Sequence, residues 1–407
     1  MRALLLATAA LAALSTSATS QGTDYSRVER GRYVAATGNC QGCHTIPGEA
    51  PYSGGRPMPT PFGTIHAPNI TFSERTGIGR WTKDDFWRAV HQGIGRDGSR
   101  LYPAFPYPHF TKMPRQDVDA VYDYLAALPR VEKESPPNSL PFPLSWRRVL
   151  AGWNLLFFTP GVYQPDPARS PEWNRGAYLV EGPGHCGACH TPKNLAGADR
   201  ASRHLQGGEL DNWAAPDIRA GRNGGISHWS EAEIVEYLKT GRNAHTAAVS
   251  IMAEVIEYST QLMTEADLKA MAVYLRSLDS PARSAATRPA EGVMAAGRAI
   301  YADNCSACHT SDGSGVPRFF GPLAGSNKVN DPNPTTVIRI LLEGARSVPT
   351  DARPTPLSMP SYAWKLTDAQ IAAVASFVRA SWGNTAPPVT EEAVRSLRQT
   401  LKEAAAH

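Results

Sequence analysis

All six cysteines of this 407-residue chain stand in three copies of one pattern, Cys-x-x-Cys-His. The copies comprise Cys40, Cys43 and His44, then Cys186, Cys189 and His190, and finally Cys305, Cys308 and His309. A structural zinc site would require two more ligands for each copy, and no regularly spaced partner motif follows. A redox-active cysteine pair does not require the histidine and would not need three copies. Neither role explains the pattern.

Covalent attachment of haem does explain it. Cys-x-x-Cys-His is the attachment signature of c-type haem. Two thiols add to the two vinyl groups of the porphyrin, and the adjacent histidine binds the iron. Because the three copies use every cysteine, the sequence predicts three covalently bound haems. The six cysteines would then be the attachment points, and His44, His190 and His309 would be iron ligands.

A short helix is expected immediately before each motif. Each of these segments carries a glycine and an aromatic residue shortly ahead of the first cysteine. The pairs are Gly31 with Tyr33, Gly176 with Tyr178, and Gly297 with Tyr301. Because glycine has no side chain, we expect each helix to cross a second helix at close range there.

Two further helices should follow each motif. Residues 79–93 and 227–241 both run from a tryptophan and a hydroxyl residue through acidic residues to a glycine, which is typical of a capped helix. Residues 333–344 take the corresponding place after the third motif. Apolar residues recur at helical spacing in 115–128, 265–278 and 368–381, so each motif should have a closing helix. The chain should therefore form three small helical domains in tandem, with haem filling much of each core.

The N-terminus has the three parts of a secretory signal. Met1-Arg2 is positively charged, residues 3–14 are apolar, and small residues at 18–20 suit a signal peptidase. The apolar run is too short to span a bilayer, so we expect residues 1–20 to be cleaved from an exported chain. The net charge of only +4 argues against a nucleic-acid partner.

Several longer stretches resemble one protein family over nearly the whole mature chain. They are TPFGTIHAPNIT (60–71), GIGRWTKDDFWRAV (77–90), DGSRLYPAFPY (97–107), NRGAYLVEGPGHCGACHTPKN (174–194) and WGN (382–384). These stretches are similar to the triheme cytochrome c subunit of bacterial membrane-associated dehydrogenases. The family includes the cytochrome subunits of alcohol, gluconate and sorbitol dehydrogenases, and partners of periplasmic aldehyde dehydrogenases.

The resemblance implies an all-α fold of three tandem class I-like cytochrome c domains, each with one covalent haem. The expected boundaries are a signal peptide at 1–20, domain 1 at 21–135, a Pro-rich linker at 136–170, domain 2 at 171–282, domain 3 at 283–386 and an amphipathic tail at 387–407. It also implies electron transfer from a catalytic dehydrogenase subunit of quinone, flavin or molybdenum type to membrane quinone or a terminal acceptor. The chain itself should have no catalytic site and should lie peripherally on the periplasmic side of the cytoplasmic membrane.

Methionine is the expected sixth iron ligand of the second and third haems. Met359 precedes the third closing helix at the distance that class I cytochromes use, and Met252 matches the family in the second domain. A gap-filling thioether in the core is the alternative for each. Met263 aligns with Leu366 and Met113 just before the closing helices, so we interpret Met263 as a core residue.

The first haem departs from the family pattern. Relatives commonly read Y-P-A-M-P-Y, whereas this chain has Phe105 in place of the methionine. We expect a substitute ligand, Met113 or His109, rather than an open position. His91 and Met58 are more distant candidates.

Two apolar segments have open roles. Residues 145–158 are expected to pack beneath a neighbouring domain rather than to dock on a membrane or subunit. The tail at 390–407 has Val394, Leu397 and Leu401 on one helical face. It could lie on a membrane or on the catalytic subunit, or it could be a solvated terminal helix.

Two rival functions remain. One is a multihaem peroxidase or reductase that uses an open first haem. The other is a free-standing electron carrier. No nucleotide loop, flavin fingerprint or catalytic triad is present in the sequence.

Overall fold

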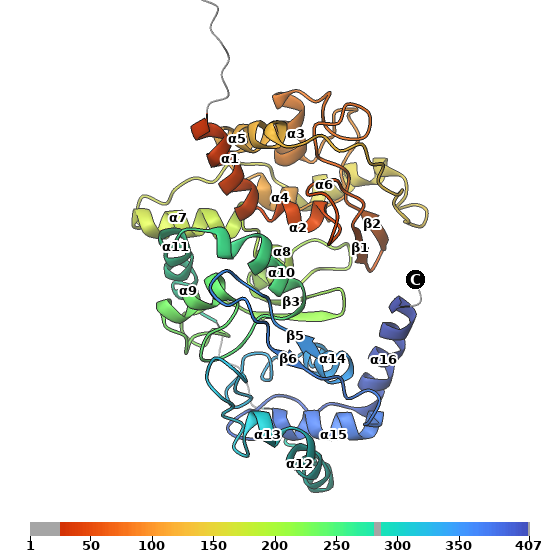
Figure 1. Ribbon diagram of the computed structural model, residues 1–407, viewed down its shortest axis with the longest axis vertical. Helices are drawn as coiled ribbons and strands as arrows, with labels where there is room; N and C mark the ends of the chain where they lie inside the picture. The colour runs from red at the N-terminus through yellow and green to blue at the C-terminus, as the bar shows by residue number, and fades with distance from the viewer. Residues whose placement is uncertain (1–24, 281–285, 406–407) are drawn as a thin grey trace, which may run out of the picture.

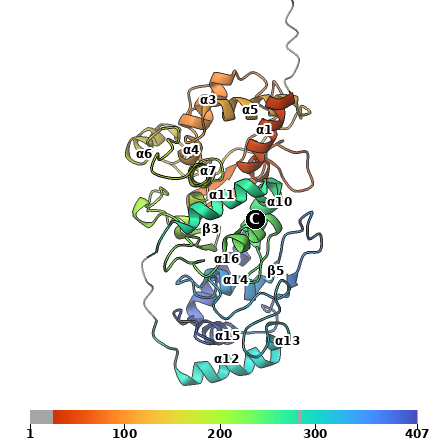
Figure 2. The ribbon, with the colours of Figure 1, turned by 90° about the vertical axis from the view of Figure 1, so that its left-hand side faces the viewer.

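The computed structural model describes residues 25–280 and 286–405, so the expected signal peptide lies outside the described residues. Most buried apolar side chains gather in three large clusters. The first runs from Val34 to Leu125, the second from Ala177 to Leu275 and the third from Met294 to Leu401. Elements packed around one cluster are called here the first, second and third unit. The units follow one another along the long axis of the molecule (Figures 1 and 2).

The first unit holds the first motif on a short helix. Its elements are α1 (Tyr25–Thr37), α2 (Cys40–His44), β1 (Pro57–Thr60), β2 (Gly63–His66), α3 (Lys83–Gln92), α4 (Tyr107–Phe110) and α5 (Arg115–Ala127). A connecting segment follows with η1 (Arg147–Val149) and α6 (Leu150–Phe157).

The second unit repeats this order with additional short helices. Its elements are α7 (Pro171–Glu181), α8 (Gly187–His190), η2 (Ala201–Arg203), β3 (Gln206–Leu210), β4 (Trp213–Asp217), α9 (Glu231–Thr240), α10 (Ser250–Tyr258), η3 (Thr260–Leu262) and α11 (Glu265–Arg276). The third unit contains α12 (Glu291–Asn304), α13 (Ser306–His309), α14 (Thr335–Glu343), β5 (Ala345–Arg346), β6 (Ser358–Met359), α15 (Asp368–Arg379) and α16 (Glu391–Ala405).

The expected helices are present, and their caps explain where two of them begin. The hydroxyl of Thr82 accepts a hydrogen bond from the backbone of Asp85 at 3.1 Å, while the Asp85 carboxylate accepts one from the Thr82 backbone at 2.9 Å. Ser230 and Glu233 form the same reciprocal cap on α9. Such a cap satisfies two backbone donors that a helix start would otherwise leave unpaired.

The expectation of a purely helical fold is incomplete. Three two-stranded antiparallel pairs, β1–β2, β3–β4 and β5–β6, lie between the helices. The strands have two to five residues each, too few for a clear alternating pattern in the sequence. The described residues are therefore helix-rich, with three short strand pairs between the helices.

Close helix crossings occur at the glycines that precede the motifs. A Cβ atom added to Gly31 on α1 would lie 1.9 Å from the Ala120 carbonyl oxygen on α5. The corresponding distance at Gly176 is also 1.9 Å, to Ala270 on α11, and at Gly297 it is 2.3 Å, to Ala373 on α15. The prediction that glycine permits a close approach at these places is confirmed.

The C-terminal tail is an integral part of the third unit. Val394, Leu397 and Leu401 on α16 are buried in the third cluster. Burial of each such side chain contributes about 1.5–3 kcal/mol to stability. The expectations for this face, docking on a membrane or partner or exposure to solvent, are therefore wrong, because the face packs on the chain's own core. The periodicity predicted the amphipathic helix but could not identify what covers it.

The connecting helix α6 is only partly covered. Leu150 and Asn154 are buried, whereas Leu155 is 85% exposed and Leu156 is 73% exposed. The expectation that this segment packs beneath a neighbouring domain is correct for one face only.

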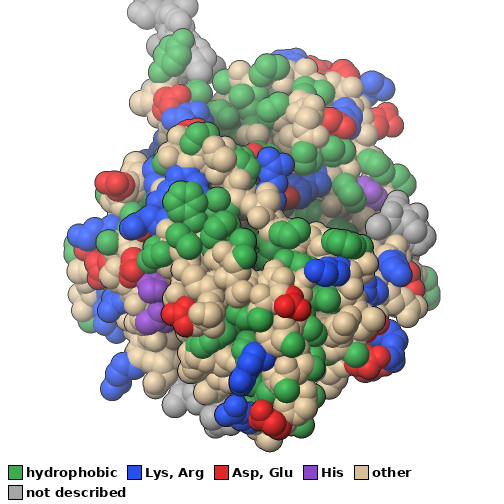
Figure 3. All heavy atoms as spheres, turned by 60° about the horizontal axis from the view of Figure 1, so that its bottom comes forward, with side chains coloured by type: hydrophobic (Ala, Val, Ile, Leu, Met, Phe, Trp, Pro, Cys, Tyr) green, Lys and Arg blue, Asp and Glu red, His purple; other side chains and the backbone are tan. Residues whose placement is uncertain are grey.

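Elsewhere on the surface, Figure 3 shows side chains of both charge signs interspersed with apolar ones on the face that it displays. Of the helices within 25–280 and 286–405, none is long and apolar enough to span a bilayer.

Candidate haem sites

The six motif cysteines are free and stand on or beside short helices. None of them is paired in a disulfide, and five are half-buried while Cys308 is exposed. Burial raises the pKa of Cys40 and Cys186 to about 12, and that of Cys189 and Cys305 to about 11. These thiols therefore keep their protons at neutral pH. Addition of a thiol across a vinyl group uses both the sulfur and its hydrogen, and free cysteines can supply both.

Each motif histidine has one ring nitrogen fixed by a backbone carbonyl. The Nδ1 atoms of His44 and His190 lie 2.7 Å from the carbonyl oxygens of Pro68 and Pro216. The Nδ1 atom of His309 lies 3.1 Å from the carbonyl oxygen of Gly321. A carbonyl oxygen only accepts, so Nδ1 must carry the hydrogen and Nε2 keeps its lone pair. Burial also lowers the pKa of all three rings, which favours the neutral form that binds a metal.

These carbonyl partners were not among the predicted site residues, although the sequence holds a signal for two of them. Ala67-Pro68-Asn69-Ile70 recurs as Ala215-Pro216-Asp217-Ile218. In both copies the side chain after the proline accepts a hydrogen bond from the backbone N–H two residues later. Asn69 accepts from Thr71 at 2.8 Å, and Asp217 accepts from Arg219 at 2.9 Å. This turn fixes the proline carbonyl. The third motif uses Gly321 in a different loop, so no repeat could reveal it.

At the edge of each cluster, the first cysteine of the motif and a residue that precedes the closing helix are both half-buried. The pairs are Cys40 with Phe105, Cys186 with Met252, and Cys305 with Met359. The structure thus places Met252 and Met359 on the same cluster as the motif that each was predicted to serve. Met263, by contrast, is only 2% exposed within the second cluster, as expected of a core residue.

The candidates for the first haem are distributed differently. Met113 is 4% exposed and belongs to the buried interior of the first cluster. The Nε2 atom of His109 lies 3.1 Å from a carboxylate oxygen of Asp199 in the second unit. The His109 ring also packs on Gly187, where an added Cβ would be 2.9 Å from its Cε1 atom. His109 therefore lies against the second motif.

The first and second motifs are close to each other. Arg56 donates one hydrogen bond of 2.6 Å to the Gly42 carbonyl inside the first motif, and it pairs at 2.6 Å with Glu254 on α10. Met252 lies on the same helix. The rings of Phe110 and His185 meet edge to face at 5.2 Å beside the second motif. A single arginine thus connects the first motif to the helix that carries the expected ligand of the second haem.

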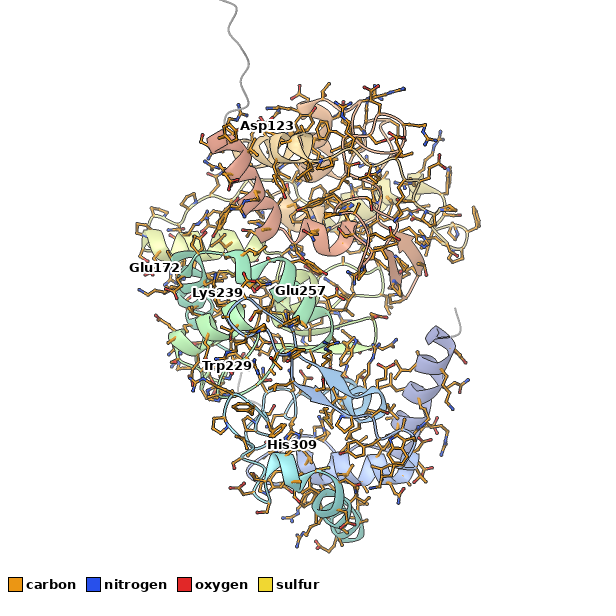
Figure 4. All side chains as sticks on the ribbon, viewed as in Figure 1. Asp123, Glu172, Trp229, Lys239, Glu257 and His309 are labelled. Atoms are coloured by element: carbon orange, nitrogen blue, oxygen red, sulfur yellow. The ribbon has the colours of Figure 1, made fainter. Side chains whose placement is uncertain are left out.

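The third unit contacts the second through helices α14 and α9, strand β4 and two loop arginines. The Thr336 hydroxyl on α14 lies 2.9 Å from both the backbone nitrogen and the carbonyl oxygen of Ala214 on β4. Glu236 on α9 receives Arg318 at 2.8 Å and Arg353 at 2.6 Å. In Figure 4, His309 lies in the lower unit, below Trp229 and Lys239 of the middle unit.

The residues present fit a covalently attached haem at each motif. Every motif supplies two free cysteines and one neutral histidine with a fixed tautomer, and each site borders an apolar cluster. Within 25–280 and 286–405, no group of three or more His, Cys, Asp or Glu side chains is arranged to hold a metal ion.

Comparisons with known proteins agree with this chemistry. The Cytochrome c family model matches residues 28–129 and 294–382. The gluconate 2-dehydrogenase cytochrome c subunit of Pantoea cypripedii is 38% identical over 98% of this chain and 94% of its own length. The alcohol dehydrogenase (quinone) cytochrome c subunit of Komagataeibacter europaeus is 41% identical over 93% of this chain and 85% of its own length.

The fructose dehydrogenase cytochrome subunit of Gluconobacter japonicus is 35% identical over 98% of this chain and 88% of its own length. The resemblance inferred from the sequence motifs is confirmed by these matches. The chain therefore belongs to the cytochrome c family, among the cytochrome c subunits of gluconate, alcohol and fructose dehydrogenases.

Proposed function

We propose that this chain is the electron-transfer subunit of a periplasmic dehydrogenase and carries three covalent haems c. It takes electrons from a separate catalytic subunit and passes them to membrane quinone or a terminal acceptor. The observation that carries this proposal is the threefold occurrence of one site, in which free cysteines and a carbonyl-fixed histidine border an apolar cluster. Each unit is then one cytochrome c domain, with α16 belonging to the third.

A haem bound at each motif supplies an iron that changes between the ferric and ferrous states. The chain's own groups hold and tune it. The carbonyls of Pro68, Pro216 and Gly321 orient the histidine rings and increase the basicity of Nε2. Met252 and Met359 are the proposed sixth ligands of the second and third haems. A methionine opposite a histidine raises the reduction potential, which suits a carrier downstream of a dehydrogenase.

The two rival functions are less favoured. The relatives named above are cytochrome subunits of dehydrogenases, which supports a non-catalytic role in a complex rather than a peroxidase or a free carrier. Export and cleavage of residues 1–20 follow from the signal pattern and suit haem attachment outside the cytoplasm.

Purification from the native host under mild conditions tests the function. A tagged chain should bring a second, catalytic subunit with it, and the visible spectrum should show haem reduction when the correct alcohol, sugar, sugar acid or aldehyde is added. High-salt removal of the partner should abolish that reduction while leaving the dithionite-reduced spectrum unchanged. Reduction of the haems by substrate in the isolated chain would contradict the proposal.

A further inference from the structure

Phe105 occupies the place in the first unit that Met359 occupies in the third. Each residue precedes a proline, Pro106 or Pro360, and each is half-buried at the edge of its cluster together with the first motif cysteine. Each segment also passes over the glycine that ends the preceding helix. A Cβ on Gly93 would lie 2.7 Å from the Tyr107 ring, and a Cβ on Gly344 would lie 2.5 Å from the Met359 carbonyl oxygen.

Met113 does not compensate for the missing thioether. It directly precedes Pro114, the N-cap of α5, just as Met263 and Leu366 directly precede the N-caps of α11 and α15. All three side chains are less than 9% exposed and lie in the interior of their clusters. In the second unit this interior methionine coexists with Met252 at the cluster edge. In all three units, the residue directly before the N-cap of the closing helix is therefore an apolar core residue.

The histidines of the first unit have other partners. His109 is held by Asp199 and packs on Gly187 of the second motif. The His91 ring stacks on Trp87 with centroids 4.3 Å apart, and its Nδ1 atom lies 3.3 Å from the Thr111 hydroxyl. Met58 lies on β1 opposite Ile65, outside the first cluster.

We propose that the haem at the first motif has no side-chain sixth ligand and that Phe105 leaves its distal position open to small exogenous ligands such as carbon monoxide or cyanide. This inference rests on the proposed haem attachment at Cys40, Cys43 and His44. It replaces the expectation of a substitute ligand from Met113 or His109. Phenylalanine has no lone pair to donate, so one haem in three would be five-coordinate while the other two are closed by methionine.

Optical and electron paramagnetic resonance spectra of the purified chain test this inference. In the parent protein about one third of the ferric haem should be high-spin, and carbon monoxide should shift about one third of the reduced haem absorption. Phe105→Met should convert that third to a low-spin form that no longer reacts. Phe105→Leu is the matched control, because it keeps an apolar side chain and should retain the reaction.

Three further variants complete the test. Met113→Ala and His109→Ala should leave the high-spin fraction as in the parent, whereas Met359→Phe should raise the reactive fraction to about two thirds. The inference is overturned if the parent is wholly low-spin, or if Met113→Ala or His109→Ala creates the high-spin signal. Haem content is measured in parallel by intact mass. A missing haem would contradict the proposed function, whereas three low-spin haems would contradict only this inference.

Discussion

Tyr178 on α7 donates its phenolic hydrogen to Asp117 on α5 over 2.5 Å, which joins the second unit to the first through two buried side chains. The reciprocal contact also exists, since Tyr33 on α1 donates to Asp267 on α11 over 2.6 Å. An arginine one turn before each tyrosine pairs with a carboxylate, Arg30 with Asp117 and Arg175 with Asp267. The first two units therefore meet through matching surfaces, with each contributing the same set of side chains.

Tyr178→Phe should weaken this interface. The buried Asp117 carboxylate would lose one donor, and a hydrogen bond to a charged group contributes about 1.5–3 kcal/mol. We expect a lower urea midpoint for unfolding with no change in haem content. Tyr33→Phe at the more exposed reciprocal contact is the control and should have a smaller effect. Equal midpoints for Tyr178→Phe and the parent would show that the contact does not stabilise the interface.

Gly31→Ala should separate α1 from α5. The added methyl would lie 1.9 Å from the Ala120 carbonyl oxygen, and overpacking of this kind costs about 1–3 kcal/mol or more. The matched control is Gly292→Ala on α12, where an added Cβ meets nothing within 4 Å. Thermal unfolding should show a lower midpoint for Gly31→Ala and an unchanged or higher midpoint for the control. A Gly31→Ala protein as stable as the parent would refute the close-packing role.

His204 and Glu181 should make stability depend on pH. Burial opposes the charge on His204, but the hydrogen bond of 2.7 Å and the charge of Glu181 outweigh it and raise the pKa of the imidazole. Burial likewise opposes the charge on Glu181, yet His204 lowers the pKa of that carboxyl. The histidine contribution is complete below about pH 6.5 and is lost as pH rises through its folded pKa. The glutamate contribution is complete above about pH 4.3 and is lost as pH falls through its folded pKa.

The contribution of this pair should therefore be largest between about pH 4.3 and 6.5. The melting temperature of His204→Gln, relative to the parent, should be lowest in that window and should approach the parent value above it. The comparison needs melts of both proteins across the pH range in one buffer series. A difference that does not vary with pH would rule out the ion pair as its source.

Leu397→Asp should destabilise the third unit. Leu397 is 9% exposed in the third cluster, and a carboxylate there would be desolvated without a partner. The exposed neighbour Ser396 offers a control, Ser396→Asp. Limited proteolysis should cut the Leu397→Asp chain within residues 291–405 faster than the parent or the control. Unchanged proteolysis would mean that α16 adds little to the third core.

The helices could be predicted from sequence, and attachment residues could be proposed from it, because their signals are local. Cap residues such as Thr82 and Ser230, the periodic apolar faces and the Cys-x-x-Cys-His spacing all lie within one segment. The carbonyl that holds each histidine and the surface that covers α16 depend on residues distant in the chain. His109 illustrates the limit, because its partner Asp199 belongs to the next unit. The short strands were missed because two to five residues carry too little periodicity.

Intact mass spectrometry shows whether each of the three motifs carries a covalent haem. The chain is produced in a host that can attach c-type haem, and its mass is compared with those of Cys43→Ala/Cys40→Ala, Cys189→Ala/Cys186→Ala and Cys308→Ala/Cys305→Ala. The parent should show three haem additions after loss of residues 1–20, and each double variant should show two. A parent mass with two or fewer haems, or a double variant that keeps all three, would contradict the account.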